Sequence, residues 1–472
     1  MEKINRFLHA LAKYKYTVAI LLGLNFILRI LVYFNTTMFK GISESGVLLG
    51  MLDRILAGER PLPIFGFYWY YTPAYIGYFF IKIFGTIHAY YIFQCLLGTI
   101  TTYLVYRIVL LMSGSRKSGI ISIILMTIYV EHILLSSVFY NQIYEVFFGA
   151  SFLLFCLLLF RERKPLRIIL FSLAIIISVY ASLLFRTTFS FSFVCLLIVA
   201  IIFPDKKQNS VFIKFFPLAI LLFLLIFVFK PINKLREGTD KQGMAFWGQT
   251  LYGGLGGENG FIFKKNEDLF NKRLKEYSIK NNIDSITPAV IEKFQKYEVK
   301  RFITKEPHKW VLLQFSKFFH TFGAVPPKDD LLMITTGKIK LPWWAASAIV
   351  QIPFVLLIFL FILTMDLKFM DLIKNNDEKV LIYFIGAYLV SGICFYATYA
   401  ERYRPVVFVL VIIPIIAINS RNLKTLFIKE NRTNLYIRMS VIILFILIWI
   451  YQAYEAMVLY SDRYFGAVNK LN

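Results

Sequence analysis

The sequence predicts an all-α polytopic membrane protein with about eleven transmembrane helices. Of its 472 residues 58% are hydrophobic and 18% are aromatic, and the mean hydropathy is +0.64. Soluble domains are only about half apolar and a quarter charged, so this composition requires lipid as a solvent. The apolar residues also fall in runs long enough to cross about 30 Å of hydrocarbon as helices.

The apolar runs set the order of the elements. Spans are expected near residues 17–34, 88–112, 118–136, 143–160, 166–185, 188–203, 214–230, 343–365, 379–398, 404–419 and 437–457. The first run is too long for a signal-peptide core and should remain as an anchor. The chain then divides into an N-terminal transmembrane module, an extracytoplasmic loop domain and a C-terminal transmembrane module, residues 1–230, 231–342 and 343–472.

The segment 71–84 determines the topology, because counting it as a span reverses every later loop. Its length of about 14 residues suits an interfacial or re-entrant helix. If it does not cross, the positive-inside rule holds throughout. All the basic segments then lie on the cytoplasmic side, namely 3–15, 107–117, 161–167, 206–214, 368–379 and 421–438.

This topology predicts a multi-pass protein of the cell membrane with a cytoplasmic N-terminus. The extracytoplasmic side receives a first loop, 35–87, which carries interfacial helices. It also receives a long loop, 231–342, with helices expected around 267–280 and 287–322. Chemistry carried by these loops would take place on the extracytoplasmic face.

Charge and motifs exclude several function classes. The net charge is +24, but the basic residues lie between the apolar runs, where membrane topology needs them, and nucleic-acid binding is not expected. The four cysteines all lie inside apolar runs and should be inert core residues. No HExxH, CxxC or GxxxxGK[ST] pattern occurs, so no metal site is assigned and nucleotide hydrolysis is not expected.

Ionisable side chains at the ends of apolar spans are the candidates for chemistry, because placing a charged side chain in or near the membrane costs free energy. Carboxylates that face arginines could activate a nucleophile beside an anionic leaving group. On the expected outer face these residues are Glu44, Asp53, Glu145, Arg186, Glu401, Arg402 and Arg404.

Two of the acids begin helices. Glu44 opens ESGVLLGMLDRILAGERP, an amphipathic pattern that should end at Gly58 and Pro61. Glu145 lies at the mouth of an apolar helix. Both acids have two interpretations. Each could be catalytic or contact the substrate, or it could simply be an acid that stabilises the start of its helix.

The arginines and aromatic residues also have two interpretations. Arg186 in SLLFRTTFSF, and Arg402 and Arg404 in AERYRP, could anchor to lipid headgroups or hold a phosphate. The cluster FGFYWYYTPAY, which includes Tyr71 and Tyr75, could be an interfacial aromatic belt or a platform for a sugar or an isoprenoid.

The outer motifs together resemble the C-class (GT-C) membrane glycosyltransferases, a superfamily that includes the protein O-mannosyltransferases and the aminoarabinose transferases. SESGVLLGMLDRILAGERPLP followed by YYTPAYIGYFFIKIFG is similar to the family's early acidic helix and its Tyr and Pro motif. EVKRFITKEPHKWVLLQFSKFFHTFG and AERYRP, with Tyr403, are similar to its later helix and its late signature.

The resemblance implies a GT-C-like fold and a hexosyl or pentosyl transferase that uses a polyprenyl-phosphate sugar. Glu44 and Glu145 would be catalytic, and Tyr71, Tyr75, Arg186, Arg402, Tyr403 and Arg404 would bind the substrate. The family's acidic pair is typically Asp then Glu, whereas this chain has Ser43 then Glu44. The base would then be Glu44, Glu145 or another acid.

The expected reaction transfers a sugar to a lipid, glycan or protein acceptor on the extracytoplasmic face of the lipid bilayer. A divalent cation, Mg²⁺ or Mn²⁺, could share the neutralisation of the leaving phosphate. Three alternatives remain: a polysaccharide polymerase or ligase, a lipid-linked-sugar transporter, and a catalytically inactive relative.

Overall fold

The computed structural model shows an all-α membrane protein, and it describes residues 2–36, 44–59, 71–185, 263–323, 334–335, 337–374, 378–396, 404–421 and 432–454. Within these ranges the chain forms helices and no strands. Six helices are long and apolar enough to cross a membrane: α2 (Thr17–Asn35), α5 (His88–Ser113), α8 (Gln142–Arg161), α9 (Pro165–Phe185), α18 (Trp343–Thr364) and α24 (Arg432–Tyr454). The predicted spans 188–203 and 214–230 lie outside the described residues, and the count of eleven stays a prediction.

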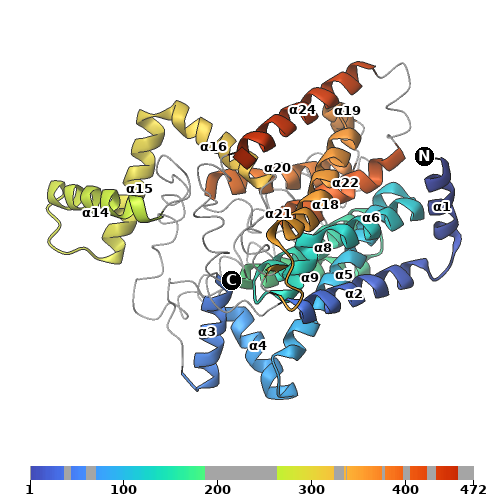
Figure 1. Cartoon of the computed structure of the whole chain (residues 1–472), viewed down its shortest axis with the longest axis horizontal. Coiled ribbons are helices and arrows are strands. Elements are labelled where there is room, and N and C mark those ends of the chain that lie inside the picture. The colour runs from blue at the N-terminus through green and yellow to red at the C-terminus, as the bar shows by residue number, and fades with distance from the viewer. Residues whose placement is uncertain are drawn as a thin grey trace.

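Most of these helices form one bundle with α6 (Arg116–Ile128), α20 (Lys379–Tyr396) and the shorter segment α21 (Arg404–Val407), η7 (Phe408–Ile412) and α22 (Ile413–Ile418) (Figure 1). Buried aliphatic residues join α5, α8, α18 and α22 in its core. η7 is a π-helical turn, and Pro414 follows it at the start of α22.

The predicted span 118–136 is broken rather than straight. α6 ends at Ile128, and the chain bends by 69° into α7 (Val130–Leu134) and the 3₁₀ turn η2 (Leu135–Ser137). Tyr129 between them is extended, with φ −78° and ψ 90°. No proline or glycine marks the break, so the pattern of apolar residues does not reveal it.

Two short helices lie between α2 and α5, as the sequence predicts. α3 (Glu44–Leu56) begins at Glu44 and is followed by Gly58, whose φ of +82° favours a residue without Cβ. α4 (Tyr71–Phe84) packs against α3 and α5. Figure 1 shows α3 and α4 at the lower end of the bundle, and we call this end the α3 end.

The α3 end also contains the last residues of α2 and the first residues of α5, α8 and α18. The backbone N–H of Lys338, shortly before α18, donates to the carbonyl of Asn35 at the end of α2, with N···O 2.8 Å. The hydroxyl of Tyr33 pairs with Nδ1 of His88, which begins α5. Segments predicted to share the extracytoplasmic side therefore lie together.

The opposite end, which we call the α19 end, carries α1 (Glu2–Lys13), α19 (Phe369–Lys374) and the described parts of the predicted cytoplasmic segments 3–15, 107–117, 161–167 and 368–379. Arg116 donates to the carbonyls of Tyr14 and Lys15 at 2.9 and 3.0 Å. Arg161 at the end of α8 pairs with Glu378 at 2.6 Å. These contacts join four of the basic segments pairwise.

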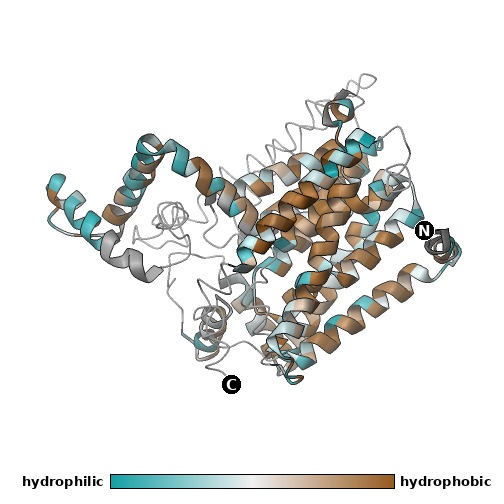
Figure 2. Ribbon diagram, turned by 45° about the horizontal axis from the view of Figure 1, so that its top comes forward, coloured by the Kyte–Doolittle hydropathy of each residue, from teal (hydrophilic) through white to brown (hydrophobic). Residues whose placement is uncertain are grey.

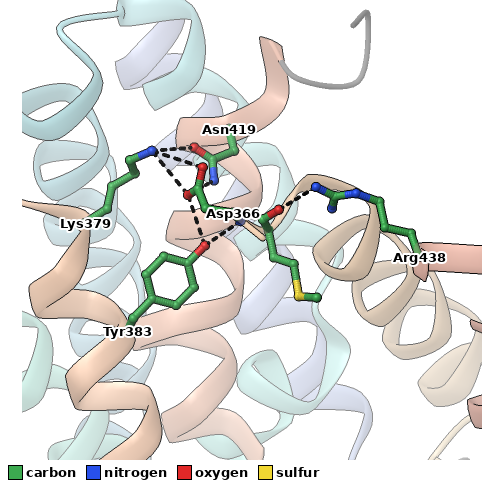
Figure 3. A network of polar contacts seen from close by, with 6 residues as sticks. Asp366, Lys379, Tyr383, Asn419 and Arg438 are labelled. Atoms are coloured by element: carbon green, nitrogen blue, oxygen red, sulfur yellow. Dashed lines mark hydrogen bonds and ion pairs between the residues drawn. The ribbon is translucent and has the colours of Figure 1, made fainter. Parts of the chain in front are cut away.

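A polar network ties four helices together at the α19 end (Figure 3). Asp366, which follows α18, accepts from Lys379 Nζ at 3.2 Å, Asn419 Nδ2 at 2.8 Å and Tyr383 Oη at 3.1 Å. Arg438 of α24 donates to the carbonyl of Met365 at 2.7 Å. The network fixes the C-terminal ends of α18 and α22 relative to the first turns of α20 and α24.

The predicted helices of the long loop form an arm beside the bundle: α14 (Phe263–Lys280), α15 (Pro288–Lys305) and α16 (Pro307–Thr321). Figure 1 shows α14 and α15 standing apart, while α16 returns to the bundle. Figure 2 shows the arm as mostly hydrophilic beside a hydrophobic bundle. The expected helical stretch 287–322 is two helices, because Glu306 precedes Pro307 and leaves the helical conformation.

Candidate functional site

The predicted site residues are only partly within the described structure. Arg186, Arg402 and Tyr403 lie outside the described residues. Glu44 and Tyr71 are the first residues of α3 and α4, and their side chains also lie outside the described part. The structure therefore describes the side chains of three predicted site residues, which are Tyr75, Glu145 and Arg404.

The helix that begins at Glu44 is firmly packed at the α3 end. Leu48, Met51 and Leu52 of α3 are at most 2% exposed and join one cluster with Tyr90 of α5 and Tyr144 of α8. Aromatic rings contact one another within this cluster, and we call the whole cluster the aromatic core. The predicted early acidic helix and the first turn of α8 therefore share a single core.

Glu145 lies in the first turn of α8 and is completely buried. Its backbone N–H donates to the carbonyl of Asn141 at 3.2 Å, which starts the helix. The interpretation of Glu145 as a solvated helix-start acid is therefore wrong. Its side chain is therefore held away from bulk water, where a carboxyl group needs polar partners.

Uncharged polar groups gather around the aromatic core. The Nε2 amide of Gln94 donates to the hydroxyl of Tyr90 at 3.2 Å, and the Tyr90 ring lies 4.7 Å from that of Phe139. The Tyr144 ring stacks on Phe185 at the end of α9, with centroids 4.2 Å apart. Side chains of α5, α8 and α9 thus pack in one cluster with Tyr144, the residue before Glu145.

Several of these groups have no partner among the described residues. Such buried atoms cost about 1–3 kcal/mol each when unpaired, so a ligand or ordered water normally satisfies them. In this region they are Gln94 Oε1, Ser137 Oγ, Asn141 Oδ1 and Ser182 Oγ. We call these four residues the polar cluster.

Arg404 lies inside the protein rather than in a headgroup region, since it is 1% exposed. Its Nη1 pairs with Glu131 Oε1 at 3.2 Å, while Nε and Nη2 donate to the carbonyls of Thr321 and Gly323 at 2.6 and 2.8 Å. Its guanidinium carbon lies 4.6 Å from the centre of the Phe354 ring. Arg404 thereby joins α7, α16, α18 and α21.

Glu131 and His132, which are neighbours at the helix break, contact two different arginines. Glu131 faces Arg404 and also accepts from the Tyr129 hydroxyl at 2.9 Å. Nδ1 of His132 lies 2.7 Å from Nη2 of Arg29 in α2, and the His132 carbonyl accepts from Nη1 at 2.9 Å. Because Arg29 can only donate, Nδ1 of His132 accepts and its Nε2 carries the proton.

Sequence reasoning missed Arg29 and gave no role to Glu131 or His132. Arg29 is fully buried and also binds Asn25 Oδ1 at 3.0 Å and Ser136 Oγ at 2.6 Å. The available signal was an arginine in the middle of the first apolar run, since charges at that depth are rare and face the bundle interior. Its partners could not be read from the sequence.

Tyr75 lies on α4 and exposes 49% of its surface, whereas Ala74 beside it is fully buried. Among the described residues no three His, Cys, Asp or Glu side chains come close enough to hold a metal ion. A divalent cation stays a prediction. The described cysteines Cys95, Cys156 and Cys394 form no disulfide with one another.

No protein-family model matches the chain, and no curated protein matches its sequence.

Proposed function

We propose that the protein is a membrane glycosyltransferase that moves a sugar from a polyprenyl-phosphate donor to a lipid, glycan or protein acceptor on the extracytoplasmic face. The observation that carries this proposal is the burial of Glu145 next to the polar cluster at the α3 end. A sugar ring presents hydroxyls that both donate and accept hydrogen bonds. Uncharged groups such as those of Gln94, Ser137 and Asn141 are complementary to them.

The chemistry needs one carboxylate and one cation. Glu145 or Glu44 accepts the proton of an acceptor hydroxyl, while the oxygen of that hydroxyl forms a bond to the anomeric carbon of the sugar. The bond between that carbon and the phosphate oxygen breaks, and polyprenyl phosphate leaves with the electron pair. Positive charge near this oxygen lowers the barrier.

The arginines divide this work. The Nε, Nη1 and Nη2 atoms of Arg404 donate to protein acceptors. In our proposal Arg186 and Arg402 therefore meet the phosphate, and Arg404 fixes the segment that presents Arg402. The polyprenyl tail would lie along the apolar helices in the bilayer.

The proposal is tested with purified protein and a panel of polyprenyl-phosphate sugars. Release of polyprenyl phosphate by the wild type, and its loss in Arg402→Ala, would support it. Arg163→Ala is a matched control, because Arg163 is exposed in the turn between α8 and α9 at the α19 end. No release from any donor would overturn the proposal.

A second candidate function is transport of a lipid-linked sugar. The break between α6 and α7 favours it, because broken helices with charged residues at the break line transport sites, and Glu131 and His132 lie there. Proteoliposomes separate the two functions. A transporter moves intact donor across the membrane, whereas a transferase consumes it.

A further inference from the structure

α16 presents apolar side chains outward. Val311, Leu312 and Phe315 expose 45%, 64% and 59% of their surfaces. Phe315 follows Leu312 by three residues and Val311 by four, and these spacings place the three side chains on one side of the helix. Exposed His308 and Lys309 lie at the N-terminal end of this face. We call Val311, Leu312 and Phe315 the α16 face.

The C-terminal end of α16 is fixed to the bundle. The Phe319 ring lies 6.2 Å from that of Phe445 in α24, and Gln452 Nε2 donates to the Phe319 carbonyl at 3.1 Å. Trp449 Nε1 donates to the Phe322 carbonyl at 2.8 Å. The position of α16 along α24 is therefore defined.

That position lies in the outer third of a hydrocarbon core about 30 Å thick. Arg438, near the start of α24, belongs to the α19 end, and Gln452 lies about 21 Å further along the axis at 1.5 Å per residue. Exposed aromatic residues mark the level near Gln452. These are Tyr451 and Tyr454 of α24.

Exposed Trp and Tyr side chains at the ends of apolar helices are typical of the membrane–water interface. α24 is a candidate span whose Ile446, Leu447 and Ile450 are exposed beside this level. The α16 face thus continues a surface that already needs lipid. Basic residues at its outer end suit lipid phosphates.

We propose that α16 is an interfacial helix whose partner is the lipid bilayer, with the α16 face inserted at the α3 end of the bundle. The helix carries α15 and α14 on the aqueous side. Because the carbonyls of Thr321 and Gly323 at its end hold Arg404, contact with lipid also fixes that arginine. The proposal does not depend on the glycosyltransferase function.

Spin labels on the full-length protein in lipid nanodiscs test this inference. Single cysteines replace Leu312, Phe315 or Lys300 in a background without the four native cysteines, and Lys300 is an exposed control on α15. At Leu312 and Phe315, collisions with O₂ should exceed those with an aqueous nickel complex, at a depth of about 5–10 Å. The label at Lys300 should show the reverse.

Two results would overturn the inference. Nickel accessibility at Leu312 equal to that at Lys300 would place α16 in water. Low accessibility to both reagents would mean that a protein, such as a second copy of the chain, covers the α16 face. As a check on insertion, Leu312→Asp should move the Phe315 label into the aqueous phase, whereas Leu312→Ile should not.

Discussion

Arg404 and Glu131 lie 273 residues apart in the sequence and form an ion pair inside the bundle, with Nη1 3.2 Å from Oε1. Glu131 is the second residue of α7, which follows the break, and Arg404 is the first residue of α21. Both side chains are at most 2% exposed. The pair therefore joins the two transmembrane modules near the α3 end.

Replacing Glu131 should destabilise the protein strongly. Glu131→Gln removes the carboxylate that pairs with the buried guanidinium of Arg404, at a cost of about 3–5 kcal/mol. The exposed pair of Arg161 and Glu378 supplies the control, and Glu378→Gln should cost about 0–1 kcal/mol. Thermal unfolding in mild detergent measures both. Equal shifts in Tm would contradict the role of the buried pair.

Gly98 of α5 should not tolerate a side chain. A Cβ built there lies 2.4 Å from Nη1 of Arg29, and the guanidinium cannot retreat without losing its bonds to His132 and Ser136. Gly98→Ala is therefore expected to lower Tm. Gly23→Ala in α2, where nothing lies within 4 Å, is the control and should leave Tm unchanged or raise it. If Gly98→Ala behaved like Gly23→Ala, Arg29 would not be fixed as described.

Stability should depend on pH through Lys317 of α16. Burial lowers the pKa of Lys317 to about 8 from its ordinary 10.5, and the nearby Cys394 thiol opposes this shift. Between these two values the unfolded chain binds a proton that the folded chain lacks, so stability rises with pH there. Lys317→Met should raise Tm most below pH 8, and the gain should shrink up to pH 10.5.

Lys300→Met, at an exposed position of α15, is the control for Lys317. Its Tm difference from the wild type should not change across the same pH window. A pH-independent effect of Lys317→Met would mean that Lys317 carries its charge in the folded protein as it does in water.

The topology can be tested by labelling from one side. Arg163→Cys lies in the basic turn beside the Arg161–Glu378 pair, and Lys338→Cys lies near the end of α2. An impermeant maleimide added to intact cells should label Lys338→Cys and should reach Arg163→Cys only after lysis. Labelling of Arg163→Cys in intact cells would reverse the predicted orientation.

Apolar runs and helix-end residues predict much of the fold. The starts of α3 at Glu44 and α5 at His88 follow from the pattern, as does the Gly58 turn. These features depend on local sequence, where period and backbone preference dominate. The short helix 71–84 was also predicted with its observed bounds.

Long-range polar contacts could not be predicted in this way. His132 lies 103 residues from Arg29, and Glu131 lies 273 residues from Arg404. The break at Tyr129 has no local signal, and the contacts of Glu131 and His132 with these two arginines hold its second half in place. The burial of Glu145 depends on how α5 and α9, which are distant in sequence from each other, pack against α8.

The central claim is tested most directly by the rate at which polyprenyl-phosphate sugar is consumed by Glu145→Gln. The account predicts a loss of about 10²–10⁴-fold relative to the wild type, because a general base is removed while the side-chain volume is kept. Glu162→Gln, in the turn after α8, should retain the wild-type rate. Full activity of Glu145→Gln would contradict its catalytic role.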